Sequence, residues 1–177
     1  MRNDAVNAVF EDNAVLTENS NFARDLFNRS VFGTILRNGR VKLSFYEAFF
    51  LFEKDKLNVL DKKNKTLSFE TFIRRSRKAD KDFLIKYAVF KDLREKGYVV
   101  KTGLKFGAPF RVYNKGIKPG EDHALWVVFP VHESNSLTWH DFSAKARVAH
   151  STKKKLLIGV VDDEGDVSYW ENMWIKP

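Results

Sequence analysis

The chain has 177 residues, a formal net charge of +8 and no cysteine. The absence of cysteine excludes disulfides, thiolate metal sites and a cysteine nucleophile. The positive charge favours an anionic partner, most often a nucleic acid, although a soluble basic protein with scattered lysines has the same composition. No apolar run approaches the ~20 residues that span a membrane, and the first residues lack the apolar centre of a signal peptide, so we expect a cytoplasmic protein.

The first part of the chain, residues 1–79, is predicted to form a small α+β domain. Residues 5–17 alternate loosely between apolar and polar, which predicts two short strands joined by a polar turn. The Asn38-Gly39 pair predicts a hairpin within residues 31–41. Helix N-cap signals complete this domain and predict three helices. They are Ser20 or Asn21, then Ser44 with Glu47 in a capping box, then Ser68.

The second part, residues 80–177, is predicted to form a mixed β-sheet flanked by helices, an α+β or α/β arrangement with a nuclease-like layout. Residues 80–96 show the clearest helical pattern, which Gly97 ends. A further helix is expected over residues 139–150, with Thr138 as its N-cap. Strand-like runs complete the domain, in chain order YVVKT, PFRVY, ALWVVFPV, KLLIGVVD and VSYWENMWI.

Three residues of this second domain carry groups suited to acid–base chemistry. Tyr113 closes the run FRVY beside a glycine turn, where we expect a half-exposed side chain with an available hydroxyl. His123 precedes the run ALWVVFPV, and a histidine pKa of about 6.5 suits an acid or a base at neutral pH. Lys154 lies within a run of lysines, 153–155, at a helix–strand junction. Each also has an ordinary structural interpretation, as a surface tyrosine, a turn histidine and a helix-capping lysine.

The sequence offers no recognisable cofactor motif. The four histidines show no HxxxH spacing, and no Walker loop, dinucleotide fingerprint or convincing serine triad is present, so we expect neither a metal nor a cofactor. A phenol, an imidazole and an ammonium suit RNA cleavage, because RNA carries its own nucleophile, the 2′-hydroxyl. Tyrosine is a poor base at its usual pKa of about 10, so neighbouring cations must lower that pKa, or Tyr113 only orients the hydroxyl.

Three segments, GLKFGAPFRVY, KPGEDHALWVV and RVAHSTKKKLLIGVVD, resemble the archaeal tRNA-splicing endonucleases in order and spacing. The resemblance is strong over residues 98–170 and holds by pattern only in the first half. It implies excision of introns from precursor tRNA at bulge–helix–bulge elements, leaving 2′,3′-cyclic phosphate and 5′-hydroxyl ends. It also implies Tyr113 as general base, His123 as general acid and Lys154 as transition-state stabiliser, with Lys153 and Lys155 as alternatives for the lysine.

The resemblance further implies RNA-gripping residues and an assembly. Arg147 matches the family's motif arginine, which helps to hold a bulged base. The aromatic pair Tyr169-Trp170 is a candidate for the second side of that grip, although for Trp170 a core ring at a strand end is equally compatible. A chain this short resembles the members that assemble as homotetramers, in which an acidic loop docks into a basic pocket of an opposing subunit. The acidic residues here also suit an ordinary solvated turn. They are Asp162, Asp163, Glu164 and Asp166.

Two other functions stay open on the sequence alone. One is a non-catalytic structural or RNA-binding subunit of a splicing endonuclease, since some members of the family lack the three catalytic residues. Their presence here favours an enzyme. The other is a metal-dependent DNA nuclease, because the C-terminal layout resembles nuclease folds. The absence of a PD…(D/E)xK arrangement argues against that alternative.

Overall fold

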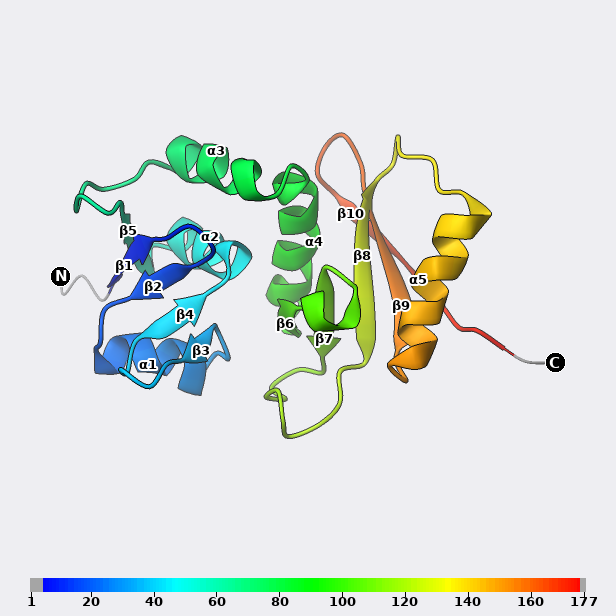
Figure 1. The fold of residues 1–177 in the computed structure, drawn as a ribbon, viewed down its shortest axis with the longest axis horizontal. Helices are drawn as coiled ribbons and strands as arrows, with labels where there is room; N and C mark the ends of the chain where they lie inside the picture. Colours follow the sequence, from blue (N-terminus) through cyan, green and yellow to red (C-terminus); the bar gives the residue numbers. More distant parts are fainter. Residues whose placement is uncertain (1–4, 176–177) are drawn as a thin grey trace. The chain divides into compact units, whose positions relative to one another are not determined.

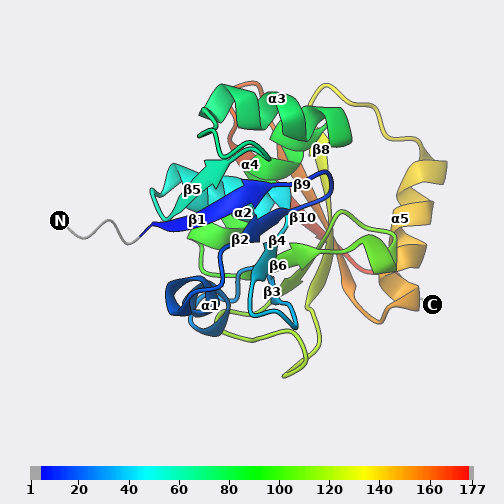
Figure 2. The ribbon, with the colours of Figure 1, turned by 60° about the vertical axis from the view of Figure 1, so that its left-hand side comes forward.

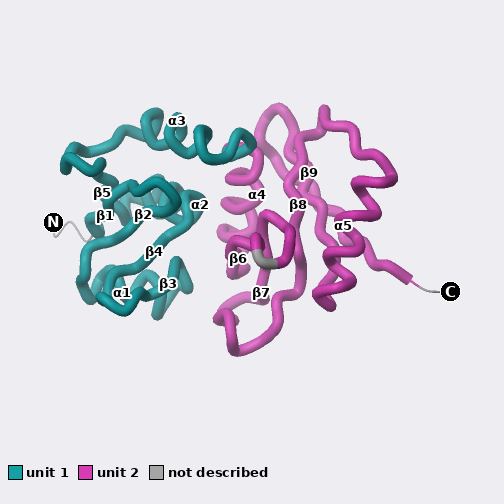
Figure 3. The backbone as a smooth tube through the Cα atoms, in the orientation of Figure 1, with its two compact units in different colours: residues 1–83 teal, residues 84–177 magenta. Residues whose placement is uncertain are grey.

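A computed structural model describes residues 5–175, with only the backbone described at position 105. The chain divides into two compact units, residues 1–83 and residues 84–177 (Figure 3). Each unit has its own five-stranded sheet, which confirms the predicted combination of an α+β domain with a second mixed sheet. Among the described residues, no helix has both the length and the apolar character needed to cross a membrane.

The N-terminal unit contains a sheet of order β3-β4-β2-β1-β5 and three helices (Figure 1). Neighbouring strands are antiparallel except β1 and β5, which run parallel. The sequence pattern did not predict β5, because four residues between a helix and a polar loop are too few to show a clear alternation. The elements are β1 (Val6–Phe10), β2 (Val15–Thr17), α1 (Asn21–Asn28), β3 (Thr34–Ile35), β4 (Val41–Leu43), α2 (Phe45–Glu53), β5 (Leu57–Leu60) and α3 (Phe69–Ala79).

The predicted helix starts of this unit are confirmed by their caps. Ser20 accepts a hydrogen bond from the amide of Ala23, and Ser68 accepts one from the amide of Thr71. Ser44 and Glu47 form the full capping box, in which each side chain bonds the other residue's backbone amide. The core of the unit is aromatic: the ring of Phe10 stacks on Phe45 at 4.8 Å and meets the edge of Phe72 at 5.0 Å.

The C-terminal unit is a sheet of order β10-β9-β8-β7-β6, with α4 on one face and α5 on the other (Figures 1 and 2). Only β8 and β9 are parallel, and α5 connects them. Thr138 and Asp141 cap α5 in the predicted capping box. The elements are α4 (Phe83–Glu95), β6 (Val99–Thr102), the short 3₁₀ helix η1 (Leu104–Phe106), β7 (Phe110–Tyr113), β8 (Trp126–His132), α5 (Trp139–Ser151), β9 (Lys155–Val161) and β10 (Val167–Asn172).

Helix α4 closes one face of this sheet by close packing. The rings of Phe90 and Phe110 lie 5.9 Å apart. Gly159 of β9 lies against Val89, where an added Cβ would come within 3.0 Å of the valine Cγ2. A larger residue at position 159 would therefore push α4 away from the strand that begins at Lys155.

Helix α5 covers the opposite face, over a buried apolar cluster that includes Val127 and Leu156. Side chains alternate between the two faces along a strand, and Arg111 pairs with Val127 across β7 and β8. Arg111 and Tyr113 therefore lie on the α5 face, and so does Lys154, two residues before Leu156. The fold thus brings the tyrosine and the lysine of the predicted site to one face of one sheet.

The two ends of the sheet carry different loops (Figure 1). The β7–β8 loop, residues 114–125, and the start of β9 lie at one end. The acidic turn between β9 and β10 lies at the other end. Seven residues of β9 separate them, a distance of about 20 Å in an extended strand.

Candidate active site

The strand register places Tyr113 and Lys154 on either side of Leu125. The amide of Leu125 donates a 2.8 Å hydrogen bond to the carbonyl of Val112, and its carbonyl accepts a 3.1 Å bond from the amide of Lys155. The strand pairings end with Val112 opposite Trp126 and Trp126 opposite Lys155. Continued by one residue, the same register has Leu125 between Tyr113 and Lys154. Because neighbouring strands lie about 4.8 Å apart, the Cα atoms of the tyrosine and the lysine are about 10 Å apart.

Tyr113 is buried, with 5% of its surface exposed, so the expectation of a half-exposed side chain was wrong. The cause is the face on which the residue lies. Its ring points to the α5 side, where the guanidinium carbon of Arg111 lies 5.6 Å from the ring centroid. No hydrogen bond joins its hydroxyl to the part of the chain that the structure describes. The ring is thus held by packing, and the hydroxyl is not committed to a structural role there.

His123 is exposed on the β7–β8 loop, where its amide donates a 2.6 Å hydrogen bond to the carboxylate of Asp122. His123 lines a cavity of about 680 Å³ together with all three lysines, 153–155, Leu125, and residues of α5 and the C-terminal segment. Tyr113 does not line this cavity. His123 and Lys154 therefore line the same cavity, whereas Lys154 and Tyr113 lie on the same face of the sheet.

The ammonium of Lys154 is fixed on the α5 face by two contacts. It donates a 2.8 Å hydrogen bond to the carbonyl of Thr152 and lies 4.9 Å from the ring centroid of Phe106. Burial lowers the pKa of Lys154, and the nearby positive charge of Arg111 lowers it further. Lys154 is thus a partly desolvated cation held within the candidate site.

The three consecutive lysines have different environments. Lys155 is the first residue of β9, and its side chain lies on the α4 face, opposite to that of its neighbour Leu156. It donates a 2.8 Å hydrogen bond to the carboxylate of Glu171. That carboxylate also accepts a 2.7 Å bond from the indole of Trp126. Lys153 is exposed and has a left-handed backbone, with φ of +54°. These placements favour Lys154 over its neighbours as the cation that shares a face with Tyr113.

Two residues of this site, Phe106 and Arg111, were not selected from the sequence. Arg111 alternates with Tyr113 in FRVY, and that signal was sufficient to place both on one face. Phe106 is brought over the sheet by the tight turn that starts at Gly103. A Cβ on Gly103 would lie 2.7 Å from the carbonyl oxygen of Ala108, so this turn requires glycine.

The two predicted RNA-gripping residues lie outside the cavity. Trp170 of β10 pairs with Ile158 and so faces the α5 side, with 54% of its surface exposed. It is therefore not a core ring of this chain. Arg147 is exposed on α5, and no ion pair joins it to any residue in the described range. Both side chains are accessible to a ligand on the α5 face.

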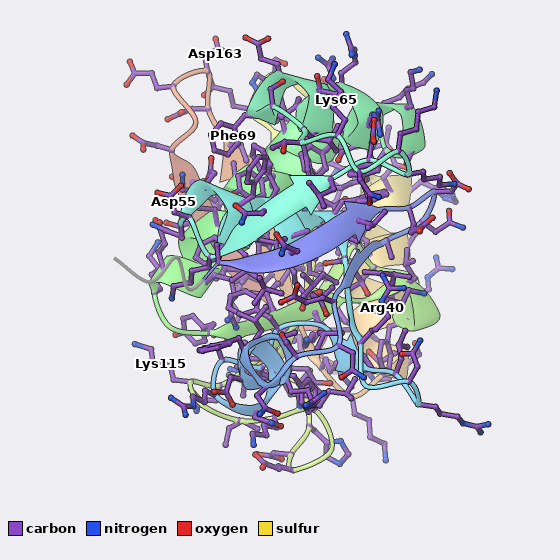
Figure 4. All side chains as sticks on the ribbon, turned by 90° about the vertical axis from the view of Figure 1, so that its left-hand side faces the viewer. Arg40, Asp55, Lys65, Phe69, Lys115 and Asp163 are labelled. Carbon is purple, nitrogen blue, oxygen red and sulfur yellow. The ribbon has the colours of Figure 1, made fainter. Side chains whose placement is uncertain are left out.

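The acidic turn is shaped by Asp162, whose carboxylate accepts hydrogen bonds from the amides of Glu164 at 3.0 Å and Asp166 at 2.9 Å. Asp163 projects from the turn (Figure 4), and its Oδ1 lies 3.2 Å from the Nε2 of His132. Glu164 and Asp166 form no ion pair with residues 5–175. Asp162 therefore maintains the turn, while the other carboxylates are presented outward.

The described residues do not form a recognisable metal centre. No three His, Asp or Glu side chains within them converge as metal ligands would. The contact between His132 and Asp163 supplies one imidazole and one carboxylate, fewer than the three or four protein ligands of a usual zinc site.

Comparison with known proteins places both units in one family. The model of the tRNA intron endonuclease N-terminal domain matches residues 6–73, and that of the tRNA intron endonuclease catalytic C-terminal domain matches residues 83–169. The tRNA-splicing endonuclease of Thermococcus onnurineus is 42% identical over 160 residues, covering 90% of this chain and 91% of the relative. That of Pyrococcus furiosus is 45% identical over 141 residues, 80% of each chain. That of Methanothermobacter thermautotrophicus is 39% identical over 166 residues, 94% of this chain and 95% of the relative. The chain therefore belongs to the tRNA intron endonuclease family.

Proposed function

We propose that this protein is a metal-independent endoribonuclease that excises introns from precursor tRNA by cutting at bulge–helix–bulge splice sites in the cytoplasm. Family membership and the names of the relatives support this function. The observation that carries it is the placement of Tyr113 and Lys154 on one face of the sheet, with His123 on the cavity that Lys154 lines. A phenol, an imidazole and an ammonium can supply the base, the acid and the positive charge that assist RNA cleavage by its own 2′-hydroxyl.

The proposed reaction moves two protons and exchanges one phosphorus–oxygen bond for another. Ionised Tyr113 takes the proton of the 2′-hydroxyl, and the 2′-oxygen attacks the adjacent phosphorus. The bond from phosphorus to the 5′-oxygen breaks as the new bond forms. Protonated His123 gives its proton to the departing 5′-oxygen. The products are a 2′,3′-cyclic phosphate and a 5′-hydroxyl, without oxidation or added water.

Lys154 serves this reaction as a fixed positive charge. The phosphorane that forms during the attack carries more negative charge than the starting diester. A cation already held in place, and partly shielded from water, stabilises that charge without reorganisation. The hydrogen bond to the Thr152 carbonyl and the contact with the Phe106 ring provide this preorganisation.

Arg147 and Trp170 suit the binding of an unstacked nucleotide next to the cut. Both are exposed, on α5 and on the α5 face of β10 respectively. A guanidinium and an indole can each stack on a base, which is how proteins usually hold single-stranded or bulged RNA. Their position outside the cavity fits a role in substrate placement and not in the chemical step.

We further propose that the protein assembles as a homotetramer in which the acidic turn of one copy binds a basic surface of another. The length of β9 keeps the turn about 20 Å from the catalytic lysine of its own chain. Apolar side chains are also exposed at the C-terminal end, which is typical of surfaces that contact another protein. They are Trp170, Met173, Trp174 and Ile175.

Cleavage of a precursor tRNA with a bulge–helix–bulge element, in the presence of EDTA, tests the proposed function. We expect cuts at both exon–intron junctions, with cyclic phosphate and 5′-hydroxyl ends. Binding without cutting would instead support a non-catalytic subunit. Activity that is lost in the chelator and restored by a divalent cation would support a metal-dependent nuclease.

A further inference from the structure

Arg111 is a partly buried cation that forms no hydrogen bond or ion pair with a described side chain or carbonyl. A guanidinium has five N–H donors, which are normally satisfied when the group is removed from water. The Nε of Arg111 is buried and has no hydrogen-bond partner. In the described part of the chain, no carboxylate or carbonyl accepts a hydrogen bond from the rest of the group. Its contacts are with the faces of two rings, Phe106 at 5.4 Å and Tyr113 at 5.6 Å.

A second cation shares one of these rings. The ammonium of Lys154 lies 4.9 Å from the centroid of Phe106. Since each cation lies about 5 Å from the same ring centre, the two charges are at most about 10 Å apart, which is within the screening length at 0.1 M salt. Neither cation forms an ion pair with a carboxylate among residues 5–175.

A cation on the other face of the sheet shows the usual arrangement. Lys96 lies 5.3 Å from the ring of Tyr169, and it also pairs with the carboxylate of Asp92 at 2.5 Å. Arg111 and Lys154 likewise lie over an aromatic ring, that of Phe106, but no carboxylate among the described residues pairs with them as Asp92 pairs with Lys96. Two like charges held close together destabilise the folded chain unless an anion binds between them.

We propose that Arg111 and Lys154 form a two-cation site for the non-bridging oxygens of the scissile phosphodiester. The site rests on the proposed RNA cleavage and adds Arg111 to it as a residue that contacts the substrate. Arginine suits this task because its planar fork bonds two phosphate oxygens at once. The rings of Phe106 and Tyr113 fix the plane of the guanidinium, so little conformational entropy is lost when the phosphate binds.

The placement of Arg111 next to Tyr113 connects this site to the attacking hydroxyl. The two side chains are neighbours on the α5 face, and Lys154 lies across the same face. A phosphate bound between the cations is therefore close to the phenol that is proposed to take the 2′-proton. One arginine then contributes both to substrate binding and to the positioning of the phosphorus for attack.

A double-mutant cycle tests the contact. The RNA is a bulge–helix–bulge duplex with a 2′-deoxynucleotide before the cut, which prevents cleavage. It carries either the normal phosphodiester or a neutral methylphosphonate at the scissile position. Dissociation constants are measured for the wild-type protein, for Arg111→Gln and for Lys96→Gln, a control that removes a ring-bound cation from the opposite face.

We expect Arg111→Gln to weaken binding of the normal RNA by roughly 10- to 100-fold, as for loss of hydrogen bonds to a charged group. The same variant should bind the methylphosphonate RNA within about 3-fold of wild type, because the contact is already absent. Lys96→Gln should show no such difference between the two RNAs. Equal weakening of both RNAs by Arg111→Gln, or no weakening of either, would overturn the site.

The proposed function is separated from this inference by cleavage of the all-ribose duplex. A wild-type protein that cuts it, combined with the absence of coupling, defeats the Arg111 site alone. A wild-type protein that does not cut it defeats both. If Arg111→Gln fails to fold, Arg111→Lys enters the same cycle. Because lysine keeps the charge but lacks the fork, we expect a smaller coupling of the same sign, and zero coupling would contradict the site.

Discussion

Tyr113 is the last residue of β7 and Lys154 immediately precedes β9, and Leu125, the residue before β8, links their neighbours Val112 and Lys155 by backbone hydrogen bonds. Both residues are therefore held next to the paired strands, and the amide of Lys154 also donates a hydrogen bond to the carbonyl of Ala149 in α5. His123, in contrast, comes from the β7–β8 loop. The backbones of the proposed base and cation are thus anchored to regular secondary structure, while the proposed acid belongs to a loop, the kind of segment that usually adjusts to a substrate.

Replacement of Tyr113 by phenylalanine should remove activity without destabilising the fold. The hydroxyl forms no hydrogen bond with described residues, so the folded chain loses little. Loss of a general base typically lowers the rate by about 10²- to 10⁴-fold. Single-turnover cleavage of precursor tRNA and thermal unfolding provide the two measurements. Full cleavage activity in this variant would contradict the assignment.

Tyr46→Phe is the matched control. The hydroxyl of Tyr46 bonds the carboxylate of Asp80, and burial together with this bond raises the tyrosine pKa. Removing it should cost about 1 kcal/mol of folding free energy and leave cleavage unchanged. The two variants should therefore show opposite patterns of stability and activity.

Replacement of His123 by alanine should be rescued by a better leaving group. We expect a loss of roughly 10²- to 10⁴-fold on ordinary RNA. A substrate with sulfur in place of the 5′-oxygen needs no proton on departure, so most of that loss should disappear. Tyr113→Phe should gain no comparable rescue. Equal behaviour of the two variants on the sulfur substrate would argue against His123 as the acid, and His140→Ala is the control for an exposed histidine.

Replacement of Lys154 by glutamine should lower the cleavage rate and not the stability. The lowered pKa means that the folded state binds this proton less tightly than the unfolded chain does. The charge therefore disfavours folding below the folded-state pKa, and the penalty disappears at higher pH. Lys154→Gln should match or exceed the wild-type melting temperature at pH 7, and the difference should vanish at alkaline pH. Lys155→Gln, which breaks the pair with Glu171, is the control and should keep most activity.

Because of Glu171, the free energy of unfolding of the C-terminal unit should decrease at low pH. Hydrogen bonds from Lys155 and from Trp126 lower its pKa. Its contribution is therefore present at neutral pH and is lost as the pH falls through the lowered folded-state value. For an exposed pair we expect no more than about 0.5 kcal/mol. The difference in melting temperature between wild type and Glu171→Gln should be largest near pH 7 and absent near pH 2.

Charge reversal in the acidic turn should disrupt the proposed tetramer. Asp163→Lys combined with Glu164→Lys changes the outward carboxylates and spares Asp162, which holds the turn. We expect the tetramer to dissociate into smaller species with a dissociation constant at least about 10-fold higher. Sedimentation or light scattering measures this. A variant of unchanged mass would show that the turn is only solvated, and Glu53→Lys serves as a control for a single added reversal elsewhere.

Local patterns were sufficient for most of the fold. The capping boxes at Ser44 and Thr138 were visible because each cap depends on residues three positions apart. The five strands of the C-terminal unit followed from apolar runs between turn residues. Strand β5 was missed because its pairing with β1 depends on residues about fifty positions away. Such long-range pairing leaves no local signal in a run of four residues.

The site was less accessible to sequence patterns, for a physical reason. Tyr113 was expected to be half exposed because it ends a strand beside a glycine turn, but the packing of its ring, including the contact with Arg111, is a tertiary effect. Which of three consecutive lysines enters the site depends on the alternation of β9 and on the partner that Glu171 offers to Lys155. Neither fact can be obtained from spacing alone.

Strand β9 begins next to Lys154, the proposed catalytic lysine, and ends at the acidic turn, and it is hydrogen-bonded along both edges by β8 and β10. In the proposed tetramer, a neighbouring copy that binds the turn therefore contacts one end of β9, whose other end lies next to the proposed site of the scissile phosphate. Binding of the turn in the assembly would restrict the motion of β9 and so of Lys154 at its other end. Subunit contact and alignment of the proposed catalytic lysine would then depend on the same strand.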